Sequence, residues 1–156
     1  FFGEVDWIEG FLSKNISRRK GDPNIDGFMR FKSGVYASFQ ACDVSKYLLF
    51  ELNCFMDKGR IVLKNSGFNI DFYKADESKC FSGYKELYKA RQYFKTKYKR
   101  NFMVNAVEHL VDCIKNKKKS VSSGDDGLRA LELIDASILS AKNDGKRISC
   151  RKKEMR

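Results

Sequence analysis

Hydrophobic and polar residues alternate with a period of two over the first part of the chain. A first run covers residues 5–11, where the apolar positions are Val5, Trp7 and, after one slip in phase, Phe11. Two further runs, residues 25–31 and 35–41, are separated by Ser33-Gly34, a sequence typical of a tight turn. This periodicity predicts β-strands, with the polar segment of residues 13–23 as a loop between the first two.

Three more strands are expected between residues 47 and 73. Residues 47–55 are almost continuously aromatic or aliphatic, and Asp57-Lys58-Gly59 and Asn65-Ser66-Gly67 separate that run from residues 60–63 and 68–73. Parallel neighbours need long crossover connections, which these short turns cannot provide. The strands are therefore predicted to form a largely antiparallel meander.

The period changes to that of helices in the last third of the chain. A helix is predicted at residues 101–115, with an apolar stripe formed by Met103, Val107, Leu110 and Ile114. Ser122 or Ser123 can cap a second helix that ends at Gly145, and its acidic first turn suits the helix dipole. The stripe predicted to be buried in this helix comprises Leu128, Leu131, Ile134, Ile138 and Ala141. A short closing strand is expected at Ile148.

Strands followed by helices predict an α+β fold, a predominantly antiparallel sheet with helices packed on one face. Large side chains occupy both alternation phases of the meander, at Tyr36, Phe50, Phe55, Phe68 and Phe72. Helices on one side leave the other face open and apolar, and faces of this kind usually mark interfaces. A homo-oligomer formed through the open sheet face is therefore expected.

Composition bounds the size and the setting of the protein. The 156 residues, 42% of them hydrophobic and 13% aromatic, suit one globular domain spanning residues 1–156. Neither a membrane-spanning run nor a signal segment is found, so a cytoplasmic protein is expected. The five cysteines have no C-x-x-C spacing and are interpreted as reduced thiols, with no zinc site. The chain enters directly on Phe1-Phe2-Gly3, which indicates a fragment of a larger protein.

The net charge of +11 raises the alternative of a basic nucleic-acid-binding module. Its excess of Lys and Arg lies largely in residues 95–100, 117–119 and 146–156. Solvated lysines at loops and helix ends explain such runs, and this interpretation is favoured because no recognition helix or RNA-binding motif accompanies the charge.

Few residues offer catalytic chemistry. His109 is the only histidine and precedes Cys113 by four residues, but one such pair cannot complete a zinc shell, so an ordinary half-buried histidine is favoured. Asp125 and Asp126 are adjacent on a helix and are assigned to capping rather than to a metal. There is no Walker A loop, dinucleotide-binding glycine motif or nucleophile elbow. Catalytic, cofactor-binding and metal-binding residues are therefore not assigned.

Two polar segments are candidates for substrate binding. Asn15, Arg18 and Arg19 project from the loop of residues 14–22, where such donors suit hydroxyls, carboxylates or phosphates. A merely solvated basic loop is the favoured alternative. Tyr93 belongs to a second group, with Tyr84, Tyr88, Arg91 and Tyr98, which can stack on sugars or nucleotides or, by the slightly favoured alternative, pack on the sheet.

Several segments together carry a resemblance that spans almost the whole chain. Residues 121–131 (VSSGDDGLRAL) are followed by Ala136, Ser140-Ala141-Lys142 and Gly145-Lys146-Arg147-Ile148, while residues 26–34 (DGFMRFKSG) and 2–5 (FGEV) lie upstream. These are similar to the closing pattern, a hairpin and the first C-terminal-domain strand of the Gfo/Idh/MocA oxidoreductases. That family includes glucose-fructose oxidoreductase and myo-inositol dehydrogenase.

The resemblance implies a C-terminal substrate-binding and oligomerisation domain. The whole enzyme would use NAD or NADP, held by an N-terminal Rossmann domain that this chain lacks, to move a hydride to or from a sugar, cyclitol or sugar nucleotide. The family's H-x-x-D histidine and E-K-P lysine are missing, and His109 does not match the former. The chain is therefore expected to supply substrate-pocket walls and subunit contacts, without cofactor binding or catalysis when isolated.

Overall fold

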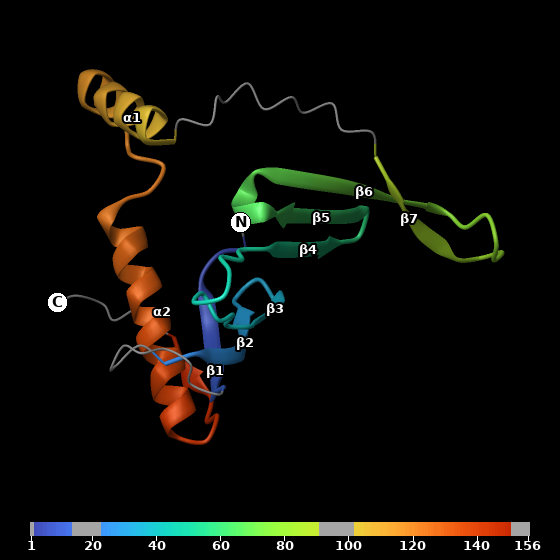
Figure 1. Ribbon diagram of the computed structural model, residues 1–156, viewed down its shortest axis with the longest axis horizontal. Helices are drawn as coiled ribbons and strands as arrows, with labels where there is room; N and C mark the ends of the chain where they lie inside the picture. The colour runs from blue at the N-terminus through green and yellow to red at the C-terminus, as the bar shows by residue number, and fades with distance from the viewer. Residues whose placement is uncertain (1, 14–22, 91–101, 151–156) are drawn as a thin grey trace. The chain divides into compact units, whose positions relative to one another are not determined.

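The computed structural model of the chain describes residues 2–13, 23–90 and 102–150. Figure 1 labels its helices and strands. The strands are β1 Val5–Leu12, β2 Ile25–Phe31, β3 Tyr36–Phe39, β4 Leu52–Met56, β5 Gly59–Lys64, β6 Asn69–Glu77, β7 Lys85–Lys89 and β8 Ile148–Ser149; the helices are α1 Phe102–Asn116 and α2 Gly124–Lys142, and η1 Asn65–Gly67 is a 3₁₀ turn. All strand pairs are antiparallel, which confirms the predicted α+β class with a mainly antiparallel sheet.

The chain divides into two compact units, each with its own sheet. The first unit comprises Phe1–Asp43 with Val104–Arg156, and the second comprises Val44–Met103. The first sheet has the strand order β3-β2-β1-β8, and the second has the order β4-β5-β6-β7. The strands expected to form one meander thus form two four-stranded sheets.

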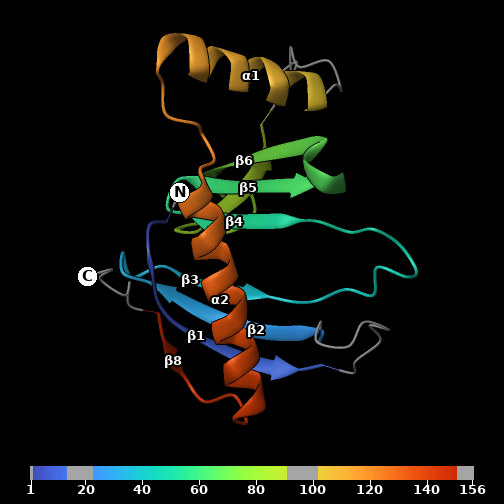
Figure 2. The same cartoon turned by 90° about the vertical axis from the view of Figure 1, so that its left-hand side faces the viewer.

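The core of the first unit lies between its sheet and α2. Figure 2 shows α2 crossing β1 and β2, and it packs on both strands. Buried Val5, Ile8 and Cys150 form the centre of this core, with Met29, Phe31, Phe39, Leu133, Ala136 and Ile148 packed around them. The expected closing strand is present as β8, where Ile148 pairs with Ile8.

The phase slip noted in the first strand is a change of register near Asp6. The pairing of β1 with β2 shifts between Val5 and Trp7. Val5 and Ile8 therefore both face the core, although alternation places them on opposite sides. Trp7 lies on the other side of the sheet, so the expectation that Val5 and Trp7 share one face is wrong.

Small residues bring α2 unusually close to β1. A Cβ atom added at Gly10 would lie 2.5 Å from the backbone oxygen of Ser137, so only glycine fits at this crossing. Ser140 is fully buried at the same place, where its Oγ accepts a hydrogen bond from the Gly10 N–H at 2.9 Å and donates one to the Lys146 carbonyl at 2.7 Å. The helix is thereby joined to β1 by a hydrogen bond as well as by packing.

The start of α2 is confirmed, but its predicted buried stripe is wrong. Ser123 is the N-cap, and it forms a reciprocal capping box with Asp126. Leu128, Leu131 and Ile134 are 51%, 60% and 52% exposed, whereas Ala141 is buried as expected. The face on the sheet instead carries Arg129, Leu133, Ala136, Ser137 and Ser140. Hydrophobicity alone selects the larger side chains, while the close approach at Gly10 requires the smaller ones.

Helix α1 forms where predicted and ends in a Schellman motif. Lys117 has a φ of +49°, and the N–H of Lys118 donates to the Cys113 carbonyl at 3.0 Å, which is the pattern of that motif. The apolar stripe is exposed rather than buried, with Met103 at 76% and Ile114 at 71%. Cys113 is the one buried side chain in the described part of this helix.

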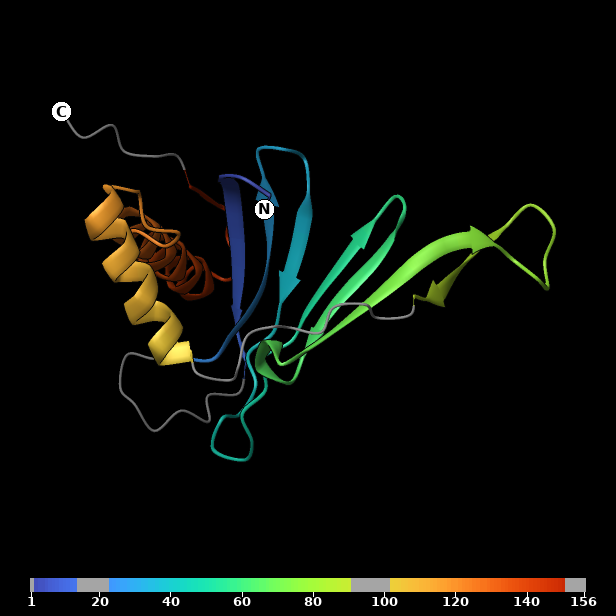
Figure 3. The ribbon, with the colours of Figure 1, turned by 90° about the horizontal axis from the view of Figure 1, so that it is seen from above.

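The second unit is a four-stranded meander, in which each strand pairs with the next along the chain; Figure 3 shows it from above. The turn before β5 needs glycine, because a Cβ atom at Gly59 would lie 2.0 Å from the Tyr73 carbonyl oxygen. The continuous run at residues 47–55 is only partly a strand, since β4 begins at Leu52. Strand β7 was not predicted, because its two apolar residues, Leu87 and Tyr88, are adjacent and do not alternate with polar ones.

The two faces of this second sheet differ in chemistry. The pairing of the strands places the apolar side chains Leu52, Cys54, Met56, Ile61, Leu63, Ile70 and Phe72 on one face. The opposite face carries Asn53, Phe55, Arg60, Val62, Lys64, Asp71, Tyr73 and Lys89, of which Val62 is buried. The sheet is thus amphipathic, and Phe55 and Phe72 point to different sides.

Candidate functional site

The residues predicted to bind substrate, Asn15, Arg18, Arg19 and Tyr93, lie outside the described residues. Their assignment stays a prediction. The ends of the first segment are held together, because the N–H and Oγ of Ser13 both donate to the Asn24 carbonyl, at 3.1 and 3.2 Å. These bonds extend the pairing of Leu12 with Ile25 by one step beyond the sheet. Ser13 and Asn24 are therefore held together where β1 ends and β2 begins.

Aromatic and arginine side chains line the open face of the first sheet, on the side away from α2. The guanidinium carbon of Arg147 lies 3.8 Å from the centroid of the Trp7 ring, and Trp7 meets Tyr36 edge to face at 6.1 Å. Arg30 lies over the outer part of Tyr36 at 5.8 Å. Cation–π contacts of this kind keep each ring and each guanidinium in a defined orientation.

Carboxylates complete this aromatic–arginine row. Arg147 Nε donates to Glu9 at 2.8 Å, and Arg30 lies 3.6 Å from Asp6. The Nε atom of Arg30 is buried and has no hydrogen-bond partner among the described residues. The row therefore presents aromatic rings and guanidinium groups side by side on the open face of the sheet. Sequence reasoning missed it, although Trp7, Arg30 and Tyr36 all stand in the phase opposite to the core.

A charged cluster occupies the polar face of the second sheet. Asp71 accepts from Lys89 at 2.8 Å and from Lys64 at 3.0 Å, and these hydrogen bonds lower the pKa of the Asp71 carboxyl. The same pairing raises the pKa of Lys89. Two ammonium groups share this one carboxylate, so the cluster keeps a net positive charge while Asp71 holds both lysines in place.

Part of the tyrosine group lies in the described residues. Tyr88 donates to Glu86 at 2.8 Å, and Ser78 donates to the other oxygen of that carboxylate at 2.8 Å. These bonds lower the pKa of Glu86 and raise that of Tyr88. Tyr84 is exposed, whereas Arg91, Tyr93 and Tyr98 lie outside the described residues. Tyr88 is thus held within its own hairpin by hydrogen bonds, and stacking on a ligand by this group stays a prediction.

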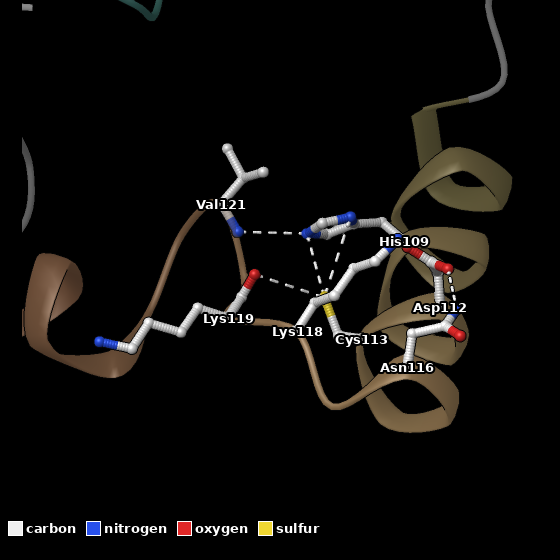
Figure 4. A network of polar contacts seen from close by, with 7 residues as sticks. All are labelled: His109, Asp112, Cys113, Asn116, Lys118, Lys119 and Val121. Carbon is white, nitrogen blue, oxygen red and sulfur yellow. Dashed lines mark hydrogen bonds and ion pairs between the residues drawn. The ribbon is translucent and has the colours of Figure 1, made fainter.

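His109 is half-buried in the middle of α1, and Figure 4 shows its ring facing the segment that follows the helix. Its Nε2 accepts a hydrogen bond from the Val121 N–H at 3.1 Å, and the Cys113 sulfur lies 3.5 Å from the same nitrogen. The Cys113 thiol donates to the Lys119 carbonyl at 3.7 Å. The pair therefore binds backbone groups of its own chain.

The described residues contain no group of three or more potential metal-binding side chains. Asp126 is engaged in the capping box, which agrees with the capping role expected for the acidic first turn of α2. None of the helices in the described part is long and apolar enough to cross a membrane.

No family profile and no curated protein matches the sequence. Solved structures match the fold. Aldose-aldose oxidoreductase from Caulobacter crescentus, complexed with glycerol, superposes with a TM-score of 0.70 at 19% identity over 94% of this chain and 42% of that one. Levoglucosan dehydrogenase, in complex with NADH and L-sorbose, gives 0.73 at 13% identity over 96% of this chain and 46% of that one.

A third match is the WlbA dehydrogenase from Bordetella pertussis, in complex with NADH and UDP-GlcNAcA. Its TM-score is 0.63 at 16% identity, over 96% of this chain and 40% of that one. The chain thus spans less than half the length of each of these three proteins. The resemblance to the C-terminal domain of Gfo/Idh/MocA oxidoreductases, expected from the sequence, is confirmed at the level of the fold.

Proposed function

We propose that the chain is the C-terminal substrate-binding and oligomerisation domain of an NAD- or NADP-dependent oxidoreductase acting on a sugar, cyclitol or sugar nucleotide. The observation that carries the proposal is the fold, because almost the whole chain superposes on parts of three oxidoreductases that act on or are complexed with such compounds. A cytoplasmic location remains a prediction.

The N-terminus of α2 does not fit a dinucleotide. Phosphates bind at helix N-termini that present free N–H groups after a glycine-rich turn. The N-terminus of α2 instead carries Asp125 and Asp126, and Asp126 closes a capping box with Ser123. An acidic first turn repels a pyrophosphate, so we assign the nicotinamide cofactor to a separate Rossmann domain. No step of the reaction is assigned to residues of this chain.

The outer faces of the helices suit a contact with that Rossmann domain. Leu128, Leu131 and Ile134 of α2 and Val107 and Leu110 of α1 are all exposed. Contiguous apolar side chains on a helix are costly in water and usually meet a partner. In the proposed enzyme this partner is the cofactor domain.

Substrate contacts are proposed for Asn15, Arg18, Arg19 and Tyr93. In the enzyme that contains this chain, Arg18→Ala and Arg19→Ala should each raise KM while leaving the unfolding midpoint of the protein unchanged. An unaltered KM in both variants would remove these residues from the pocket.

Self-association is proposed through the open apolar sheet faces. Met56 and Phe55 are adjacent in β4 and point to the apolar and the polar face, respectively, which makes them a matched pair. Met56→Asp, and Phe28→Asp on the open face of the first sheet, should lower the mass measured by light scattering. Phe55→Asp should not. A wild-type chain that is monomeric at micromolar concentration contradicts this proposal.

The activity is tested on the enzyme that contains this chain, by following the appearance of reduced nicotinamide with NAD⁺ or NADP⁺ and a panel of aldoses, cyclitols and sugar nucleotides. Turnover of at least one compound is expected. The isolated chain should show no saturable binding of NAD(H) or NADP(H) in calorimetry. Binding tighter than millimolar would overturn the assignment of the cofactor to another domain.

The alternative of a nucleic-acid-binding module is not favoured by the described residues. Lys64, Lys89 and Lys118 form ion pairs with carboxylates of the chain. Tight binding to nucleic acid with a steep salt dependence would reinstate it.

A further inference from the structure

We propose that His109 controls the attachment of the loop of residues 117–123 to α1 in response to pH. The neutral ring binds the Val121 backbone in the middle of this loop, and the protonated ring releases it. This inference is independent of the proposed oxidoreductase function. It rests on the hydrogen bonds that join the end of α1 to the start of α2.

Two backbone groups of the loop are bound by side chains of α1. The Val121 N–H donates to His109 Nε2 at 3.1 Å, and the Lys119 carbonyl accepts from the Cys113 thiol at 3.7 Å (Figure 4). The sulfur contact is a weak one. A third attachment, the ion pair of Lys118 with Asp112 of α1 at 3.1 Å, lies at the start of the loop. Of the two bonds that hold the middle of the loop, the one to His109 is therefore the stronger.

Packing does not replace that bond. The Val121 side chain is 86% exposed, so it has almost no apolar contact that could keep its backbone in place. The segment is fixed at both ends instead, by the Schellman bond from Lys118 to Cys113 and by the capping box at Ser123. Between these two ends, the position of Val121 depends on the imidazole.

The direction of the bond fixes the state of the ring. A nitrogen that accepts an N–H must carry a lone pair, so the proton of the neutral imidazole lies on Nδ1. Protonation places a hydrogen on Nε2 as well, and the ring then presents a donor to the Val121 donor. The bond is lost, and the new Nε2–H turns toward the Cys113 sulfur or the Lys119 carbonyl.

The charged groups around the ring come from both α1 and the loop. Asp112 lies on α1, where Lys118 and Asn116 donate to its carboxylate and lower its pKa. Lys118 and Lys119 lie on the loop, and the Cys113 thiol lies beneath the ring. Asp112 is already balanced by Lys118 at 3.1 Å, so no unpaired carboxylate of this cluster holds the protonated ring in its neutral geometry.

Protonation of the ring therefore loosens the middle of the link between α1 and the N-cap of α2, while the Schellman bond and the capping box still hold its two ends.

The test is a titration of the full chain by NMR. At neutral pH, long-range proton–nitrogen spectra should show Nδ1 protonated and Nε2 bare. As the pH falls, the Val121 amide should shift with the same midpoint as the ring carbons of His109. Its exchange rate, corrected for the intrinsic pH dependence, should rise roughly five- to tenfold, the factor expected for one lost hydrogen bond.

His109→Gln is the matched control, because its amide oxygen can accept the Val121 N–H without titrating. In that variant the Val121 amide should not respond to pH, whereas in His109→Lys it should exchange rapidly throughout. A neutral ring protonated on Nε2 would overturn the proposal. So would a wild-type Val121 amide whose corrected exchange stays constant through the titration of His109, or a His109→Gln variant that keeps the full pH response.

Discussion

Ser140→Ala should destabilise the first unit more than the loss of a single hydrogen bond would, because the Ser140 hydroxyl binds two backbone groups at once. Ser140 is fully buried, and its Oγ bonds both the Gly10 N–H and the Lys146 carbonyl. Alanine leaves that N–H buried without an acceptor and that carbonyl short of a donor. At about 1–3 kcal/mol for the buried N–H and about 1 kcal/mol for the part-buried carbonyl, the expected loss is about 2–4 kcal/mol in the free energy of unfolding.

Ser137→Ala is the matched control, since Ser137 is buried on the same helix. Its hydroxyl donates only to the Ile134 carbonyl, three residues earlier in α2. Replacing serine by alanine improves helix propensity equally in both variants. Because Ser137→Ala loses only a local bond within the helix, it should change the free energy of unfolding by less than about 1 kcal/mol.

The assay is urea unfolding followed by helical circular dichroism, because α2 belongs to the first unit and reports on it. The comparison requires equal slopes for the wild type and both variants. If Ser140→Ala were no more destabilising than Ser137→Ala, the bridge from α2 to β1 would not contribute to stability, and the argument would be refuted.

Further predictions concern other contacts. Gly10→Ala forces a Cβ atom against the Ser137 backbone and should lower the free energy of unfolding by about 2–3 kcal/mol. Gly127→Ala, in open space on α2, should raise it by about 0.5–1 kcal/mol. Thermal unfolding of the two variants tests both values. Arg129→Met removes the bonds to Glu4 and to the Cys150 carbonyl and should cost about 2 kcal/mol; unchanged urea midpoints would argue against it. The lowered pKa of Asp71 means that its pairing stabilises the second unit above about pH 4, and that this stabilisation is lost on acidification. Asp71→Asn should abolish that part of the pH dependence, measured by near-ultraviolet circular dichroism.

Local chemistry in the sequence predicted most of the fold. Ser123 with Asp126 gave the start of α2, and the turn sequences Ser33-Gly34 and Asp57-Lys58-Gly59 gave two hairpins. These signals depend on neighbouring residues only, so they can be recognised without tertiary structure. The strand β7 lacked such a signal and was missed.

The side of each element that faces the core was harder to predict. Alternation put Val5 and Trp7 on one face, and one change of register separated them. The helix periodicity selected Leu128 and Leu131, while contact with the sheet used Ser137 and Ser140 instead. Small polar residues become core residues only where a glycine of another element allows a close approach. Here the glycine is Gly10 and the small polar residue is Ser140, which lie 130 residues apart in the sequence.

The aromatic–arginine row could not be predicted for the same reason. Arg147 follows α2, whereas Trp7 and Glu9 belong to the first strand. Only the pairing of β8 with β1 brings them together. The predicted substrate-binding residues Asn15, Arg18, Arg19 and Tyr93 remain to be tested by the kinetic variants.

The capping box also limits how the length of α2 can vary. Ser123 fixes where the helix starts, and Ser140 must reach Gly10 seventeen positions later. Each residue turns an α-helix by about 100°, so one insertion or deletion between these two serines would swing the Ser140 hydroxyl away from β1. Insertions before Ser123 leave that angular phase untouched. Length variation among related chains should therefore collect in residues 117–122 and be absent between Ser123 and Ser140.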